Sequence, residues 1–377
     1  MSSACGAGDR AEAGAGRDAA PRPLYAAREL ARSAPEASLT AVATLDVDSR
    51  GRVYIGEGFL QAHITVLAED GAVLRRLGRR GEGPGEFQAV AAVQVLPGDS
   101  LFAYDPALGR ITVFAPDAAE VAYTVNLTAA SSVPAPDVAY RLARQHALLA
   151  LYRRSFTPRD DPHADTRVEV LLRLLTLSGT LLADSLALLP GEDVLVFRRP
   201  GFVSVKSDPP FGRKAIVRLG PEDRIFLGYT GSPSIRILDR RGTTAGEIVL
   251  PADSLPVTPQ ELDSAAATLA ENFRAVFLRS PPKRWPLYRT LVVDDRSRIW
   301  IGLAARPGRP VEWRVYDLRG AWLGSVELPD HIELRLVRSG LAYGVAHDAL
   351  GVPTIVVYQL EERPPTARAS AATRTVS

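Results

Sequence analysis

The sequence of 377 residues is poor in the residues that build disulfides, zinc cages and membrane spans. Its only cysteine is Cys5, which excludes an intrachain disulfide and a cysteine-based zinc site. No apolar run approaches the roughly 20 residues that a membrane-spanning helix needs. Lysine occurs only at Lys206, Lys214 and Lys283, and 45 basic residues face 43 acidic ones. The resulting net charge of +2 gives no reason to expect affinity for nucleic acid or another polyanion.

Six repeated units account for most of the length. Each unit contains short runs of β-branched and aromatic residues separated by turns with Gly or Asp, the pattern of a four-stranded antiparallel meander. The second unit is the clearest, with Ser100–Asp105 followed by Arg110–Phe114 and then Val121–Val125. The basic spacing is about 45 residues with two insertions of roughly 30, which is typical of propeller blades. The equivalent positions are Val53, Leu101, Leu148, Ile225, Ile299 and Leu341.

One end of the repeat region lacks a strand, and the other end has one strand too many. The sixth unit lacks an outer strand, and Leu24–Leu30 is left unassigned at the start of the chain. We predict that this N-terminal strand closes the last blade, which removes an exposed sheet edge. The expected fold is all-β, a six-bladed β-propeller over residues 23–362 with four-stranded antiparallel blades and one helical insertion. Residues 1–22 and 363–377 are expected to be a disordered leader and a disordered tail.

A link between the first two blades carries a family resemblance. The run Arg79–Phe87, with Gly83, Pro84, Gly85 and Phe87, precedes Asp105 and Arg110 in the second unit. This pattern resembles the NHL-repeat and related six-bladed propeller families. It is most similar to bacterial members that are mostly uncharacterised and often predicted to be lipoproteins. The resemblance implies an interblade turn at the glycines and an ion pair between Asp105 and Arg110 that braces a turn.

The sequence around the single cysteine indicates where in the cell the protein is located. Ser2–Gly6 resembles the lipobox of bacterial lipoproteins, in which small residues precede a cysteine that is lipidated after cleavage. Too few residues precede Cys5 for a signal peptide, so this interpretation requires a start upstream of Met1. We expect lipidation at Cys5 and a place in the cell envelope, as a periplasmic or outer-membrane lipoprotein. The alternative is a cytoplasmic protein with an incidental cysteine.

The long segments fall on one face of the predicted disc. They are residues 153–165, 186–212, 252–285 and 303–310, and all follow a second strand or link two blades. Thr258 as N-cap, Pro259 and Glu261 predict a helix over about 258–278. That helix is either a lid over the channel mouth or a segment packed sideways against a blade. Long loops on one rim of a rigid scaffold are where binding chemistry usually lies.

Two groups of side chains on this face are candidates for chemistry. Arginine can grip carboxylate or phosphate with two hydrogen bonds, although arginine on a solvated loop of an Arg-rich chain is also ordinary. The arginine candidates are Arg153, Arg154, Arg198, Arg199, Arg306 and Arg309. The densest group of metal-type ligands is weaker, because ion pairs in a solvated loop explain it equally. These residues are Asp160, Asp161, His163 and Asp165.

The sequence favours a non-catalytic binding or scaffold protein of the envelope. We expect it to recognise a protein, peptide or glycan through the face with the long loops. The alternative is a metal-dependent hydrolase or lyase with its site at the central channel. We expect no cofactor, no nucleic-acid partner and a monomer.

Overall fold

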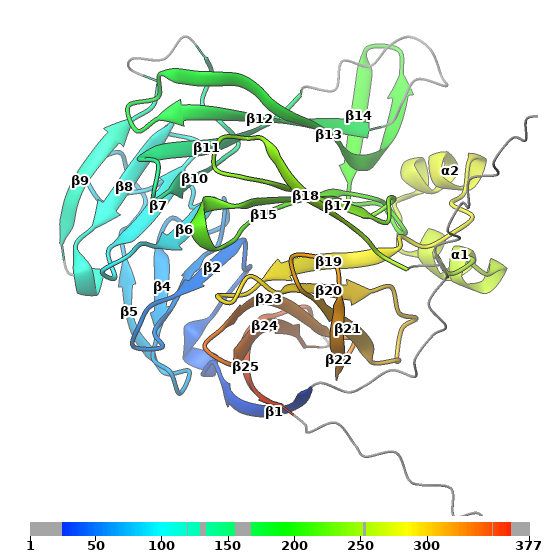
Figure 1. Cartoon of the computed structure of the whole chain (residues 1–377). Helices are drawn as coiled ribbons and strands as arrows, with labels where there is room; N and C mark the ends of the chain where they lie inside the picture. The colour runs from blue at the N-terminus through cyan, green and yellow to red at the C-terminus, as the bar shows by residue number, and fades with distance from the viewer. Residues whose placement is uncertain are drawn as a thin grey trace, which may run out of the picture.

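The computed structural model describes residues 25–118, 120–128, 133–154, 167–251, 254–348 and 350–362. In this part of the chain six antiparallel sheets surround a central channel, which confirms the predicted six-bladed β-propeller (Figure 1). In each of the first five blades the innermost strand comes first along the chain and the outer strands follow in order.

The first three blades occupy the N-terminal half of the chain. Blade one contains β2 (Thr44–Val47), β3 (Val53–Gly56), β4 (Ile64–Leu67) and β5 (Val73–Leu77). Blade two contains β6 (Ala92–Val95), β7 (Leu101–Asp105), β8 (Arg110–Phe114) and β9 (Val121–Asn126). Blade three contains β10 (Val138–Leu142), β11 (Ala147–Arg153), β12 (Arg167–Thr176), β13 (Leu181–Arg199) and β14 (Phe202–Ser207).

The other three blades follow. Blade four contains β15 (Ala215–Leu219), β16 (Ile225–Tyr229), β17 (Ser234–Leu238) and β18 (Thr244–Val249). Blade five contains β19 (Tyr288–Val293), β20 (Ile299–Leu303), β21 (Val311–Tyr316) and β22 (Trp322–Leu328). Blade six contains β23 (Ile332–Arg338), β24 (Leu341–His347), β25 (Pro353–Glu362) and β1 (Tyr25–Arg32).

The N-terminal strand closes the ring, as the sequence predicted. β1 is the outer strand of blade six and pairs antiparallel with β25, with Tyr25 opposite Glu362 and Arg32 opposite Val356. The Tyr25 ring also stacks on Trp300 of blade five, with 5.2 Å between ring centroids. β1 therefore covers the edge of β25 and packs against the preceding blade.

Two details differ from the prediction. Blade three has five strands instead of four, because Leu195–Phe197 and Phe202–Val205 are strand-forming runs joined by a tight turn at Pro200 and Gly201. The insertion between blades four and five holds two helices instead of one, α1 (Pro259–Ala267) and α2 (Glu271–Arg279). The apolar spacing did not reveal this break, since buried residues continue through it.

The blades are held together by apolar contacts between neighbouring sheets. One cluster joins blades five and six around Trp300 and Trp313, whose side chains are fully buried. Another joins blades one and two around Phe87, which has no exposed surface. Burying a large apolar side chain contributes about 1.5–3 kcal/mol, so each of these contacts between blades stabilises the ring.

The predicted ion pair between Asp105 and Arg110 is wrong. Both residues are described, and although they face each other in the register of β7 and β8, their side chains do not pair. Asp105 instead accepts the backbone N–H of Gln88 at 2.6 Å, and Arg110 donates to the Gly83 carbonyl at 3.0 Å. The two side chains fasten the link between blades to blade two because that link offers unpaired backbone groups.

A recurring brace holds the turn between the first and second strands in blades one and five. The turns are Asp48–Tyr54 and Asp294–Trp300. In blade five the Asp294 carboxylate accepts from Arg298 Nε at 2.6 Å and from Trp300 Nε1 at 3.0 Å. The equivalent bonds in blade one measure 2.6 and 3.0 Å.

Within the described residues, no helix combines the length and the apolarity that crossing a bilayer requires.

Candidate functional site

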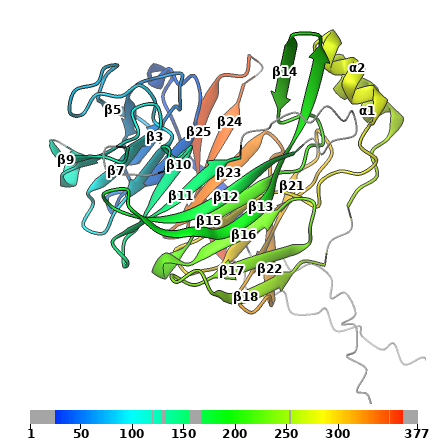
Figure 2. The same ribbon diagram turned by 90° about the horizontal axis from the view of Figure 1, so that it is seen from above.

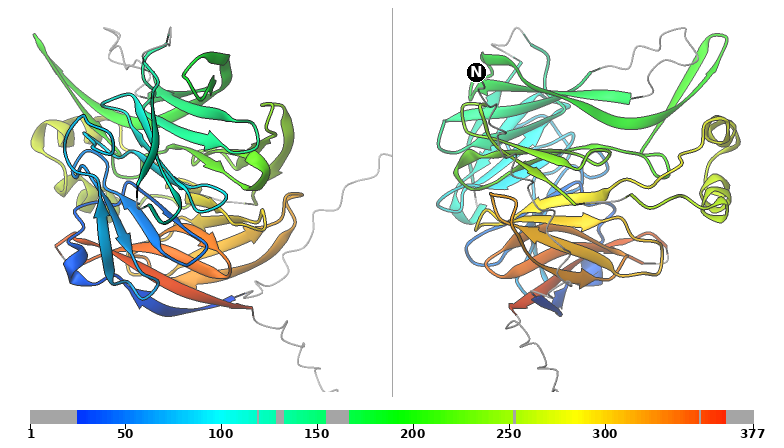
Figure 3. Two further views of the ribbon diagram at one scale, coloured as in Figure 1. Left: turned by 90° about the vertical axis from the view of Figure 1, so that its left-hand side faces the viewer. Right: turned by 45° about the vertical axis from the view of Figure 1, so that its right-hand side comes forward.

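The two faces of the disc differ in the length of their connections. Turns between first and second strands and between third and fourth strands are short, and we call their side the short-turn face. Connections between second and third strands and between blades emerge on the other side, the long-loop face. The β13–β14 hairpin and both helices project from this long-loop face (Figure 3). Of the four long segments predicted from the sequence, the described parts that emerge on this face are the β13–β14 hairpin, the helical insertion from residue 254 and the β20–β21 loop.

The hairpin leaves blade three at Gly191. This glycine has a φ of +76°, and a Cβ at this position would lie 1.2 Å from the carbonyl oxygen of Val168. The pairing of β12 and β13 is irregular here, with a register shift between Val168 and Val170. Only glycine can adopt this positive φ while the neighbouring backbone carbonyl lies so close to its Cα. Beyond the irregularity, β13 pairs with β14 from Val194 to Arg199.

The two helices pack against the hairpin. Phe277 of α2 and Leu269 between the helices are buried against Leu195 of β13 and Phe211. Phe211 also meets the Trp285 ring edge-on, with 4.8 Å between centroids. Figure 2 shows α1, α2 and β14 grouped at the same side of the molecule. No described residue of either helix lines the channel cavities, so the helices pack sideways and are not a lid in this structure.

β14 is an edge strand with an open side. It pairs only with β13 among the described strands. Side chains alternate across a strand pair, so Lys206, opposite Leu195, shares the face that meets the helices. Val203 and Val205 lie on the other face, and their side chains are 48% and 43% exposed. The hairpin therefore offers an unpaired backbone edge next to exposed apolar side chains.

The predicted arginines occupy three separate places on the long-loop face. Arg153 is the last residue of β11, and Arg154 follows it. Arg153 lines a cavity of the channel, and its backbone N–H donates to Asp137 at 2.6 Å. Arg154 forms an exposed ion pair with Glu169 at 3.1 Å. Neither contact places Arg153 or Arg154 beside the other four predicted arginines.

The other four arginines divide between the hairpin tip and the β20–β21 loop, as Arg198 and Arg199, and as Arg306 and Arg309. The Arg199 guanidinium lies 4.7 Å from the centre of the Phe202 ring. Arg306 forms an ion pair with Glu261 of α1 at 3.0 Å. The predicted set is therefore not one patch.

The metal-ligand candidates Asp160, Asp161, His163 and Asp165 lie outside the described residues, as does Cys5. Among the residues that the structure describes, no three His, Cys, Asp or Glu side chains converge as they would around a metal ion.

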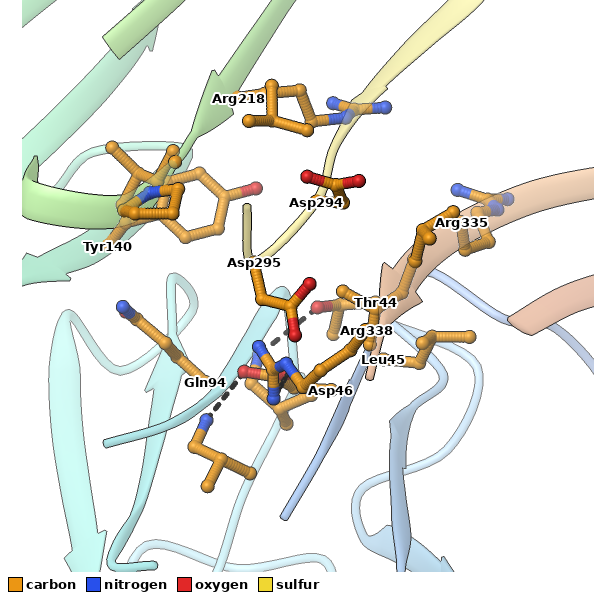
Figure 4. Close-up of a pocket in the computed structure, with 18 of the residues that line it drawn as sticks. Thr44, Leu45, Asp46, Gln94, Tyr140, Arg218, Asp294, Asp295, Arg335 and Arg338 are labelled. Atoms are coloured by element: carbon orange, nitrogen blue, oxygen red, sulfur yellow. Dashed lines mark hydrogen bonds and ion pairs between the residues drawn. The ribbon is translucent and has the colours of Figure 1, made fainter. Parts of the chain in front are cut away.

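Two cavities follow the central channel. The larger, about 460 Å³, is lined by the innermost strands and by turns of the short-turn face (Figure 4). The smaller, about 330 Å³, opens toward the long-loop face between blades three and four. Both are lined by Tyr140, Val217, Arg218 and Arg335, which we call the channel neck. Both volumes are in the range of small-molecule sites, roughly 300–1,000 Å³.

Most charges along the channel are compensated. Arg338 pairs with Asp46 at 2.8 Å, and Arg335 pairs with Glu333 at 3.0 Å. Burial raises the pKa of Asp46, and the positive charge of Arg338 opposes that shift. We take Asp46 as ionised because two backbone N–H groups and Arg338 all donate to its carboxylate. Arg218 is different, because its bonds go to uncharged acceptors.

The sequence interpretation missed the channel residues. Asp46, Gln94 and Arg218 each lie between apolar neighbours in an innermost strand, whereas Tyr140 lies between Ala139 and Arg141. In a propeller the innermost strand borders the channel, so a polar residue inside that run is the signal that could have identified them.

Comparison of the sequence with models of protein families and with curated proteins gives no match. Solved structures are similar in fold. A DUF4221 family member from Bacteroides vulgatus has 10% identity and a TM-score of 0.55, over 91% of this chain and 100% of that chain. A candidate exported protein from Bacteroides fragilis has 12% identity and a TM-score of 0.49, over 90% and 96%. Catalytically inactive virginiamycin B lyase from Staphylococcus aureus, solved with quinupristin, has 11% identity and a TM-score of 0.45, over 89% and 100%.

At sequence identities of 10–12%, the similarity to these structures concerns the fold alone. The fold class is the six-bladed β-propeller. Function has to be argued from this chain's own sites.

Proposed function

We propose that the protein is a non-catalytic binding propeller that captures an extended, acidic polypeptide segment on its long-loop face. The observation that carries the proposal is the open edge of β14. An extended peptide adds to such an edge through main-chain hydrogen bonds, while pockets and exposed side chains select its sequence. A rigid propeller presents this edge at a fixed position, as a binding module requires.

Charge and shape favour a polypeptide of this kind. Residues 194–207 of the hairpin include Arg199 and Lys206 and contain no acidic residue. Val203 and Val205 can contact apolar side chains of an added strand, while its acidic side chains meet the basic ones. A glycan would instead require several exposed aromatic rings or polar clusters, and on this hairpin only Phe202 is an exposed aromatic residue.

The test uses two synthetic peptides of about eight residues, the length of an ordinary strand. One alternates Val and Glu, and the other alternates Val and Lys. We expect the full chain to bind the acidic peptide at least about tenfold more tightly, a difference of about 1.4 kcal/mol. Equal affinity, or binding of neutral oligosaccharides in preference to both peptides, would contradict the proposal.

A proline variant tests the edge itself. In a hairpin with a two-residue turn, the pair that flanks the turn is bonded, so we expect Val203 and Val205 to direct their N–H groups outward. Val205→Pro should then abolish capture with the fold retained, because proline blocks an edge without breaking the inner ladder. Val205→Thr keeps the N–H and should bind normally. Capture by the proline variant would exclude this edge.

The cell-envelope location is also a proposal, and the sequence around Cys5 supports it. So does the resemblance of residues 79–114 to the NHL-repeat-like bacterial proteins. Mass spectrometry of protein from the membrane fraction should find a diacylglyceryl group on Cys5. Cys5→Ser should release the protein. An unmodified cysteine in a cytoplasmic protein would contradict this location.

A further inference from the structure

Arg218 stands out among the charged residues of the channel. Its Nε donates to the Leu291 carbonyl at 3.1 Å, and its two Nη atoms donate to the Val217 carbonyl and to Thr290 Oγ1. A guanidinium group has five N–H donors. Three bonds to uncharged oxygens therefore leave part of its hydrogen-bonding capacity unused. It forms no ion pair with any carboxylate among the described residues.

The surroundings of Arg218 leave a positive charge in the neck. The nearby charges are Arg335 and Glu333, which pair with each other. Asp294 and Asp295 also line the larger cavity, but neither pairs with Arg218: Asp294 pairs with Arg298, and exposed Asp295 accepts the Ser339 N–H. Burial lowers the pKa of Arg218, which reflects the cost of keeping this guanidinium charged inside the protein. An anion in the neck would compensate that cost.

A second donor lies across the neck. The Tyr140 side chain comes from blade three and points into the cavity from the side opposite Arg335 (Figure 4). Its hydroxyl has no hydrogen-bond partner among the described residues. Burial raises the pKa of Tyr140, so the phenol stays protonated and can donate. Gln94 is not available in this way, because its amide bonds to the Arg141 backbone on both sides.

We propose that the channel neck binds the oxyanion of a small ligand, a carboxylate or a phosphate, between Arg218 and Tyr140. Charge-assisted hydrogen bonds from a planar guanidinium suit either group. The two adjoining cavities, about 460 and 330 Å³, leave room for a compact organic body but not for a folded partner. This site is separate from β14, so either proposal can fail without the other.

Calorimetric titration of the full chain tests the site with inorganic phosphate and with succinate. Succinamide is the uncharged analogue, and sodium chloride at matched ionic strength controls for salt. We expect saturable binding of at least one anion with a Kd of about 1 mM or below, and no binding of succinamide. Absence of saturable binding by both anions would overturn the proposal, and so would equal binding of succinamide.

Three variants locate the binding. Arg218→Gln should weaken it roughly 10- to 100-fold and Tyr140→Phe roughly 2- to 10-fold. Arg141→Gln is the matched control, since this neighbouring arginine contacts His146 and lines neither channel cavity. Unchanged affinity in both Arg218→Gln and Tyr140→Phe would place the anion elsewhere. If Arg218→Gln does not fold, Tyr140→Phe decides the question alone.

Discussion

Arg218 of β15 donates its Nε–H to the carbonyl oxygen of Leu291 in β19, and the two atoms are 3.1 Å apart. The cation in the channel neck is thereby fastened to the next blade, and no carboxylate of the described residues forms an ion pair with it. Arg338, which lines the larger cavity with Arg218, by contrast pairs with buried Asp46 at 2.8 Å. One of these two arginines is paired with a buried carboxylate and the other is not, so their removal should change stability by different amounts.

Arg338→Met should destabilise the protein by about 2–4 kcal/mol, whereas Arg218→Met should change stability by about 1 kcal/mol or less. The first substitution leaves Asp46 without its partner cation, and the second removes a buried charge together with its hydrogen bonds. Urea unfolding of both variants measures the difference. A larger loss for Arg218→Met would show that Arg218 is structural.

The cost of Arg338→Met should also depend on pH. Burial raises the pKa of Asp46, and loss of Arg338 removes an opposing influence, so the folded pKa moves further up. A group whose folded pKa exceeds its unfolded pKa stabilises at low pH and loses that contribution as pH rises. The variant should therefore lose more stability, relative to the wild type, at about pH 8 than at about pH 5. A pH-independent difference would contradict this.

Asp294→Ala should cost about 2–4 kcal/mol. The substitution leaves the buried Trp300 Nε1–H without an acceptor and Arg298 without its closer carboxylate, since Glu362 lies 3.7 Å from it. Asp317→Ala is the matched control, because Asp317 accepts only backbone N–H groups in an exposed turn. It should cost about 1 kcal/mol or less. Equal losses in denaturant unfolding would show that the Trp300 bond contributes little.

The start of α1 should respond to acid. Hydrogen bonds from the Thr258 backbone lower the pKa of Glu261 from its ordinary value of 4.5. A lowered folded pKa stabilises above the unfolded value and is lost as pH falls through the folded one. Trp285 contacts this carboxylate, so its fluorescence should change below about pH 4.5, while Glu261→Gln should show little change. Identical titrations would contradict the role of Glu261.

Gly191→Ala should displace the β13–β14 hairpin. Its Cβ would meet the Val168 carbonyl, and the positive φ adds backbone strain, so a loss of about 1–3 kcal/mol is expected. Capture of the acidic peptide should fall with it. Gly201→Ala is the control, since a Cβ at the hairpin turn meets nothing within 4 Å although φ is also positive. The Gly201→Ala variant should still bind the acidic peptide. Loss of peptide binding in both variants would contradict a specific role of Gly191 in positioning the hairpin.

The sequence predicted the architecture because each repeat consists of short runs of strand-forming residues. Closure by β1 followed because the sixth unit lacked an outer strand and one strand at the start of the chain was unassigned. It could not predict the hairpin, since Leu195–Phe197 and Phe202–Val205 read equally well as parts of a long loop. The expected pair between Asp105 and Arg110 failed for a related reason. A spacing predicts which residues are neighbours, but backbone groups that need partners decide where the side chains go.

The candidate site was predicted only in part. The long-loop face and its insertions follow from the order of strands, whereas the channel neck draws Tyr140, Arg218 and Arg335 from three different blades. Convergence of this kind has no local signature: Arg218 and Arg335 are single polar positions in apolar runs, and Tyr140 lies beside Arg141. The arginines singled out on loops proved to be scattered, since Arg154 and Arg306 have acidic partners of their own.

The most direct test of the proposed function is amide hydrogen–deuterium exchange of the full chain with and without the acidic alternating peptide. Capture at the β14 edge predicts slower exchange in residues 202–207, because their outward N–H groups become bonded. The short-turn face should be unaffected. Protection elsewhere on the molecule, with residues 202–207 unchanged at saturating peptide, would contradict the assignment of this edge as the binding site.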